Sequence, residues 1–234
     1  RIALVTGAAS GIGKAIAETL AKNGVRSQLT RTLPRPRCIV APRKQETPMR
    51  LQVPRIPALA PEDWSDEAKQ ALAAIGRPGG MPALNIFRTL AAHPKLTKHW
   101  MVFANHVLGK NTLPPREREI LILRIGWLCR AEYEWAQHVV IGKREGLSDD
   151  EITRIGIGAD APGWSEPDRA LLRATDELWN DAMISDGTWR ELSRFLNTEQ
   201  LMDVVFTVGQ YNLVSMALNS FGVQLDAGVP GFPS

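Results

Sequence analysis

The chain has 234 residues, of which 44% are hydrophobic and 23% charged, as expected for a globular protein of one large or two small domains. Its net charge of +3 is unevenly spread, because residues 1–48 hold nine Lys and Arg against two acidic residues and the remainder holds 19 against 23. The mildly acidic body argues against nucleic-acid binding. No run approaches the roughly 18 apolar residues of a membrane span, so no membrane association is expected.

The two cysteines, Cys38 and Cys129, lie far apart and form no CxxC pair. This spacing argues against a framework of disulfides and is typical of proteins from a reducing compartment. We therefore expect a cytoplasmic protein.

Residues 1–24 have the pattern of a strand, a glycine-rich turn and a helix. Apolar residues at 2–5 predict the strand, TGAASGIG at 6–13 the turn, and helical spacing over 14–22 the helix. The turn resembles the cofactor loop of short-chain dehydrogenases, in which glycines allow the backbone to approach a pyrophosphate.

The rest of a dehydrogenase is missing from the sequence. No acidic residue occurs between Glu18 and Glu46 to bind a ribose, and neither Tyr133 nor Tyr211 has a lysine four positions later. We therefore interpret residues 1–24 as a truncated dehydrogenase-like fragment that binds no cofactor. NAD-dependent reduction is the least favoured function.

A proline- and arginine-rich segment, residues 25–60, comes after this fragment. Its apolar content is too low to offset the entropy of ordering, which predicts a disordered linker. Met49 is a natural start for the remainder of the chain, so residues 1–48 are interpreted as a remnant of a neighbouring reading frame.

Residues 61–225 have helical periodicity and repeated capping signals, which predict an all-α domain. The expected helices are 62–75, 84–92 and 96–108, a central helix opening at 113–117, and later ones capped by Ser148, Ser165, Ser185 and Asn197. A Gly- and Pro-rich tail at 226–234 is expected to lie on a neighbouring subunit.

Glu134 and His138 are the first candidates for a site, because residues four apart lie one turn apart on the same helix face. A carboxylate there orients an imidazole and raises its pKa, which suits general acid–base chemistry. Glu119 lies 19 residues before His138, about 28 Å away on one unbroken helix. It can approach His138 only if the chain breaks around 126–131, or if a neighbouring subunit supplies it.

Three segments resemble the carboxymuconolactone decarboxylase family, relatives of alkylhydroperoxidase D: LPPREREILILR at 113–124, EYEWAQH at 132–138 and GLSDDEI at 146–152. The resemblance extends over about residues 49–225. It implies an alkylhydroperoxidase D-like helical bundle that forms trimers or hexamers, with the active site near subunit contacts.

The peroxidase branch of this family uses two thiols, and the resemblance places them at Ala131 and Glu134. Glu119 and His138 match that branch, but Cys129 is two residues out of register. A lone thiol cannot complete an intramolecular dithiol cycle. Peroxiredoxin-like activity therefore stays only as an alternative.

The EYEWxxH segment resembles the decarboxylase branch, a lyase of aromatic catabolism that needs neither metal nor organic cofactor. The resemblance implies a small carboxylated lactone as substrate, with His138 transferring a proton and Glu119 or Glu134 tuning its charge. Tyr133 or Arg124 would bind the substrate carboxylate.

Other interpretations stay open from the sequence alone. His138 fits a hydrogen-bonded core histidine as well, Glu134 with His138 fits an ordinary surface pair, and the chain could be a non-catalytic helical oligomer. A zinc site at Glu119, Glu134 and His138 would lack a further ligand at the usual spacing.

Overall fold

The computed structural model describes residues 2–5, 26–29, 51–73 and 84–233. The chain divides into two compact units, Arg1–Gln45 and Glu46–Ser234. The glycine-rich turn at 6–13, the helix expected over 14–22 and Met49 lie outside the described residues.

The first unit contains two short strands. β1 (Ile2–Val5) is the predicted strand, and it pairs in parallel with β2 (Arg26–Leu29), with Ile2 opposite Arg26. β2 lies inside the range for which the sequence predicts a disordered linker, so that expectation fails at residues 26–29. Its sequence, RSQL, has neither the apolar run nor the alternation by which strands are recognised.

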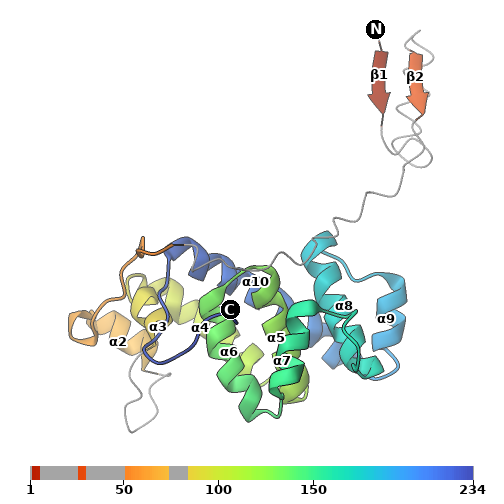
Figure 1. Ribbon diagram of the computed structural model, residues 1–234. Coiled ribbons are helices and arrows are strands. Elements are labelled where there is room, and N and C mark those ends of the chain that lie inside the picture. The colour runs from red at the N-terminus through yellow and green to blue at the C-terminus, as the bar shows by residue number, and fades with distance from the viewer. Residues whose placement is uncertain (1, 6–25, 30–50, 74–83, 234) are drawn as a thin grey trace. The chain divides into compact units, whose positions relative to one another are not determined.

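The described elements of the second unit are helical, which confirms the all-α prediction (Figure 1). They are η1 (Pro61–Asp63), α2 (Asp66–Leu72), α3 (Asn85–Leu90), α4 (Pro94–Gly109), α5 (Pro115–Leu128), α6 (Glu132–Arg144), α7 (Asp149–Ile157), α8 (Glu166–Asp181), α9 (Asp186–Leu192) and α10 (Thr198–Phe221).

Capping residues set where these helices begin. Ser148 and Asn197 form capping boxes, and Ser165 and Ser185 accept hydrogen bonds from the N–H groups of the first turn, as predicted. The helix expected over 62–75 is instead η1 followed by α2, because Ser65 caps a new helix there.

The central helix of the unit is α5, which packs against α6, α7, α8 and α10 (Figure 1). The apolar side chains at 120–123 and Ile125 are completely buried. This all-round burial explains why α5 shows a dense apolar run instead of a stripe.

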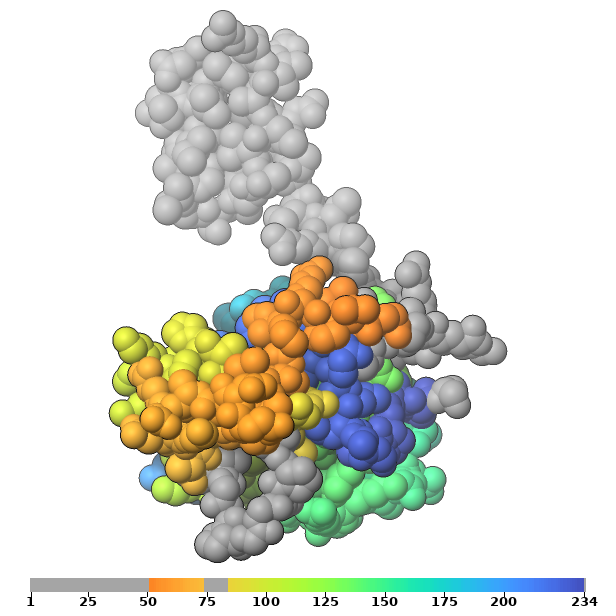
Figure 2. Space-filling model, turned by 90° about the vertical axis from the view of Figure 1, so that its left-hand side faces the viewer, coloured from red at the N-terminus to blue at the C-terminus, as the bar shows by residue number. Residues whose placement is uncertain are grey.

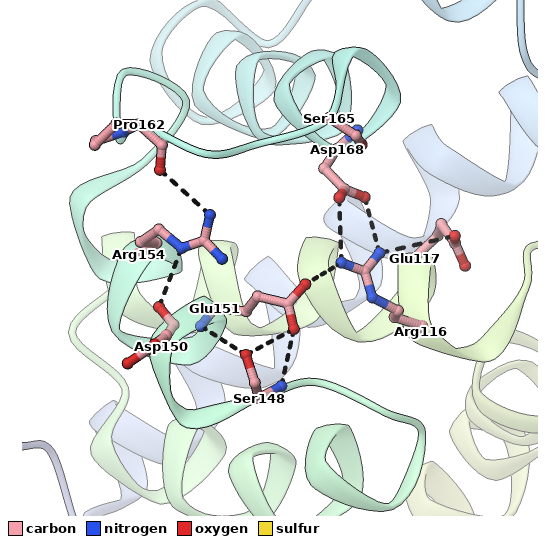
Figure 3. Close-up of polar contacts among 9 residues, drawn as sticks. All are labelled: Arg116, Glu117, Ser148, Asp150, Glu151, Arg154, Pro162, Ser165 and Asp168. Carbon is pink, nitrogen blue, oxygen red and sulfur yellow. Dashed lines mark hydrogen bonds and ion pairs between the residues drawn. The ribbon is translucent and has the colours of Figure 1, made fainter.

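Arg116 anchors the N-terminal turn of α5 to two other helices (Figure 3). Its guanidinium binds both carboxylate oxygens of Asp168 at the start of α8, at 2.9 and 3.1 Å, and pairs with Glu151 of the α7 capping box. Such a forked contact fixes direction as well as distance. The network therefore holds α5 in place one turn before Glu119.

Residues 51–56 pack on the C-terminal end of α10 and do not behave as a linker. The N–H groups of Arg55 and Ile56 donate to the carbonyl of Phe221, and Gln224 donates to the carbonyl of Leu51. Figure 2 shows this orange segment against the blue C-terminal region. The helical unit thus begins before residue 61.

The tail, described over residues 226–233, folds back on its own chain, and the expected contact with a neighbouring subunit stays a prediction. The N–H of Phe232 donates to Glu132 Oε1 at 3.2 Å, and its ring packs against Trp127 and Trp135. Asp226 accepts hydrogen bonds from α3 and α6. The tail therefore covers the start of α6.

Candidate functional site

A break between α5 and α6 brings the candidate residues together. α5 ends at Leu128, Arg130 takes the left-handed conformation with φ of 52°, and α6 begins at Glu132. The chain therefore reverses, and Glu119 Oε2 lies 2.7 Å from His138 Nδ1 within one subunit. The break falls inside the predicted range, 126–131.

His138 lies between two carboxylates. Its Nδ1 bonds Glu119, and its Nε2 lies 3.1 Å from Oε1 of Glu134, one turn earlier on α6. The exposed fractions are 6% for His138, 4% for Glu134 and zero for Glu119. The three residues form a buried acid–imidazole–acid cluster, here called the triad.

The two carboxylates decide the charge of the imidazole. Burial alone would lower the pKa of His138, but the negative charges of Glu119 and Glu134 and their contacts with the ring outweigh it and raise the pKa to about 10. His138 is therefore an imidazolium at neutral pH. Its Nδ1–H donates to Glu119, so Nε2–H is the proton that faces Glu134.

One oxygen of the triad has no hydrogen-bond donor. Glu134 Oε1 is buried and close enough to Nε2 for an ion pair, but the direction of approach does not make a hydrogen bond. A buried polar atom left in this way is uncommon and costs stability.

Two further side chains complete the surroundings, and sequence reasoning missed both. Arg118 donates through Nε to Glu119 Oε1 at 3.2 Å, and the ring of Tyr211 from α10 stands edge-on to His138 at 4.9 Å. Burial, then the charges of Glu134 and Glu119, hold the pKa of Tyr211 well above its usual value. Arg118 and Glu119 are adjacent on a helix, where adjacent side chains normally point apart, and Tyr211 is 73 positions from His138. Residue spacing therefore did not predict either contact.

Tyr133 occupies a structural position. Its hydroxyl donates to Asp226 Oδ2 at 2.6 Å and accepts from the N–H of Ile86, and Gln137 donates to the same carboxylate oxygen. Burial, then the hydrogen bond to Asp226, raise the pKa of Tyr133 above its ordinary value, and the N–H of Ile86 opposes this only in part. Both hydrogen-bonding roles of the phenol are in use within the fold, which gives no support to the expected role in substrate binding.

Arg124 also serves the fold. Its guanidinium binds Asp176 at 2.6 Å and the carbonyls of Ile155 and Gly156, which ties α5 to α7 and α8. Arg124 follows Glu119 by five residues, so the two side chains leave the helix about 140° apart. The geometry therefore does not support Arg124 as a substrate ligand beside His138.

One of the two positions of the absent thiols lies in the triad itself. Ala131 caps the start of α6 and is fully buried, and Glu134 is the triad member beside Nε2. Cys129 caps the end of α5, with its Sγ 3.1 Å from Asn212 Oδ1. A carboxylate thus stands where the second thiol would be.

The structure shows a cavity of about 100 Å³ between α3, α4 and α10, lined by apolar side chains and two threonines. A smaller one, of about 10 Å³, lies beside Tyr133. His138 lines neither. Within residues 51–73 and 84–233, no group of three or more His, Cys, Asp or Glu side chains is arranged to hold a metal ion.

Comparison with known families gives two matches. Residues 94–177 match the carboxymuconolactone decarboxylase family, and residues 1–51 match the short chain dehydrogenase family. The second match extends beyond the 24 residues that carry the sequence resemblance and includes β2. A comparison with curated protein sequences finds no match.

Solved structures similar to this chain share its helical core. The alkylhydroperoxidase AhpD core protein from Ralstonia eutropha JMP134, described as an uncharacterized peroxidase-related protein, is 16% identical, with a TM-score of 0.66 over 76% of this chain and 94% of its own. A peroxidase-related protein from Silicibacter sp. TM1040 is 17% identical, with a TM-score of 0.63 over 80% and 96%.

The debrominase Bmp8, solved in complex with 2,3,4-tribromopyrrole, is 14% identical, with a TM-score of 0.59 over 74% of this chain and 91% of its own. At these identities the similarity establishes the fold, which is the expected one. Residues 94–177 of the helical unit therefore match the carboxymuconolactone decarboxylase family, and the unit has an AhpD-like fold.

Proposed function

We propose that the helical unit is an enzyme that performs acid–base chemistry without a cofactor, decarboxylation or a related proton transfer, on a small carboxylated lactone. The observation that carries the proposal is the buried imidazole of His138, held by Glu119 at Nδ1 and facing an oxygen of Glu134 that accepts no hydrogen bond. The family of residues 94–177 supports the same reaction class.

In the proposed reaction, the carbon–carboxylate bond of the substrate breaks and leaves its electron pair on carbon as CO2 departs. The Nε2–H of His138 then protonates that carbon, and solvent returns a proton to the imidazole. Glu119 keeps hold of Nδ1–H throughout, so Nε2 is always the nitrogen that gives and regains the proton.

The charges around His138 allow an anionic substrate to approach. Glu119 and Glu134 contribute two negative charges, which the imidazolium and Arg118 balance when His138 is protonated. We propose that Arg118, in place of Arg124, is the cation nearest the substrate carboxylate, because it contacts Glu119 directly. The fold and the use of only two cysteines accord with a cytoplasmic enzyme.

The test is CO2 release from carboxymuconolactone by purified protein. His138→Gln should lower kcat by about 10²- to 10⁴-fold, the usual contribution of a positioned acid or base. His106→Gln is the matched control, because His106 is an exposed histidine on α4 and should leave the rate unchanged. Turnover that survives in His138→Gln would rule out the proposed mechanism.

Peroxide reduction is the second candidate, because two of the similar structures are described as peroxidase-related. It would require the Cys129 thiolate to attack the peroxide oxygen, giving a sulfenic acid and an alcohol, and an external thiol to reduce that acid. An unchanged rate of peroxide consumption in Cys129→Ser would dispose of this candidate.

A further inference from the structure

The outer face of α10 carries a regular stripe of exposed residues. They are separated alternately by four and three positions: Met202, Phe206, Gly209, Leu213, Met216 and Ser220. This is the spacing of a heptad seam, by which one helix packs along another. The stripe runs almost the whole length of the helix.

The opposite face of α10 is already buried in the core, through residues such as Leu201, Val208 and Leu218. The helix is therefore apolar on two sides, and a helix apolar all round is normally covered all round. In the part of the chain that the structure describes, α10 is also the helix long and apolar enough to cross a membrane by length and composition. Half of its most apolar window, however, is buried within the fold.

We infer that the stripe is covered by the α10 of a second copy of this chain, packed antiparallel about a two-fold axis near Tyr211. In such an antiparallel pair, positions equally far before and after Tyr211 face each other. Leu213 then lies against Gly209, Phe206 against Met216 and Met202 against Ser220 of the other copy. Each of the six positions then has a partner. Two of the three pairs set a large side chain against a small one.

A parallel pairing would lack this fit. Gly209 would face Gly209 of the other copy and leave a void. Phe206 would face Phe206, and Leu213 would face Leu213. Alternating large and small residues across a seam fills the space between helices, whereas equal pairs of different size do not. The size pattern thus selects the antiparallel arrangement.

Charge complementarity supports the same arrangement. α4 runs antiparallel beside α10, since the ring of Phe103 meets that of Phe206 edge to face and Trp100 lines a cavity with Val214 and Leu218. In the two-fold pair, the acidic first turns of one α10, with Glu199 and Asp203, come near the height of the N-terminal turn of α4 in the second copy. That turn is basic, with Lys95 and Lys98, and a helix N-terminus attracts negative charge.

The cavity between α3, α4 and α10 opens on this face. Its lining includes Leu96 and Leu213, which are 51% and 50% exposed. In the antiparallel pair, the Met202 end of the second α10 passes over this opening. The second copy would therefore close a cavity that one copy leaves open to solvent.

Sedimentation equilibrium of the full chain tests the surface. We expect a dimer, or a larger assembly with an even number of copies, and Met216→Asp should weaken its association by at least about tenfold, as loss of a central apolar contact does. Met183→Asp is the matched control, because Met183 is equally apolar and 66% exposed but lies outside α10. A monomeric or trimeric wild type, or equal effects of the two variants, would overturn the proposal.

Cysteine cross-linking tests the direction of packing. The double variant Met202→Cys/Ser220→Cys should form a covalent dimer on mild oxidation, whereas each single variant should not, because like positions lie about 27 Å apart along the antiparallel pair. Cys38 and Cys129 are common to all these proteins, and wild type sets their background. Cross-linking of the single variants would show a parallel pair and overturn the inference.

A lipid bilayer is the other environment that could cover an apolar helix face. Flotation with phosphatidylcholine vesicles distinguishes it, because the proposed dimer should stay out of the lipid fraction. A chain that floats with vesicles as a monomer would overturn the proposal.

Discussion

The charge on His138 depends on a few buried side chains. Two carboxylates touch the ring, Arg118 touches one of them, and Tyr211 covers the ring edge. Buried charges cost free energy unless they are paired, and here each charge has an opposite one beside it. Together with Arg118, the triad therefore holds a proton at neutral pH without a net charge in the core.

Folding stability should fall at alkaline pH because of this proton. The pKa of His138 is raised in the folded state from 6.5 to about 10, so its contribution is complete below pH 6.5 and is lost as pH rises through 10. Chemical denaturation of wild type and His138→Gln at pH 6, 8 and 10 measures it. The difference between the two should shrink across this window, and a constant difference would contradict the raised pKa.

Glu119→Gln should separate charge from hydrogen bonding. Glutamine can still accept from Nδ1–H, but it removes a negative charge, so the pKa of His138 should fall and activity should decline at lower pH than in wild type. The expected cost in stability is about 1–3 kcal/mol, typical of a changed buried charged pair. A pH–rate profile identical to wild type would show that Glu119 does not set the proton affinity.

At the scale of elements, α5 is the helix that positions the site. Its first turn is fixed by Arg116, its middle is buried, and its end reverses through Arg130. The reversal brings Glu119 against α6. Small residues permit this close approach, because a Cβ on Gly142 would lie only 3.0 Å from Leu147 and 3.3 Å from Leu123.

The anchor of α5 should matter more than a surface ion pair of similar length. Asp168→Ala breaks a forked contact in which the aspartate side chain is 10% exposed, and should cost about 1–3 kcal/mol. Glu191→Ala breaks the Arg173 contact, whose side chains are 38% and 46% exposed, and should cost less than about 1 kcal/mol. Thermal unfolding of both variants compares them, and equal losses would contradict the anchoring role.

The helices could be predicted because the sequence signals that define them act over short stretches of chain. Caps such as Ser148 and Asn197 act within one turn, and apolar periodicity reports the buried face of each helix. The Glu119–His138 contact could be predicted because, within one subunit, the two residues meet only if the helix breaks between them, around residues 126–131.

Contacts between distant segments left no comparable trace in the sequence. Tyr211 reaches His138 only because α10 packs against α6. The role of Tyr133 follows from Asp226, and that of Arg124 from the end of α7 and from Asp176 of α8. β2 was missed because its polar residues carry no strand pattern. Long-range packing decides these roles, and residue spacing does not record it.

On the scale of the whole molecule, the chain joins two units with different family matches. The site residues all lie in the second unit, so a chain that begins at Met49 should keep the fold and the activity. This is measured by circular dichroism and turnover. Loss of either would show that the first unit is needed.

A chain shortened further, to begin at Pro61, should be less stable. It loses the N–H groups of Arg55 and Ile56 that donate to Phe221, and the packing of Leu51 against Gly222. At about 0.5–1.5 kcal/mol per hydrogen bond, the melting temperature should fall by roughly 2–8 °C for a unit of this size. No change would mean that residues 51–60 do not support the helical unit.

The proposed chemistry depends above all on His138 being a buried imidazolium held between Glu119 and Glu134. The most direct test is an NMR titration of the histidine ring nitrogens, with the His138 signals assigned from their absence in His138→Gln. We predict that both nitrogens of His138 stay protonated through neutral pH and lose a proton only near pH 10. A midpoint near 6.5, the value of an isolated histidine, would contradict this charge state.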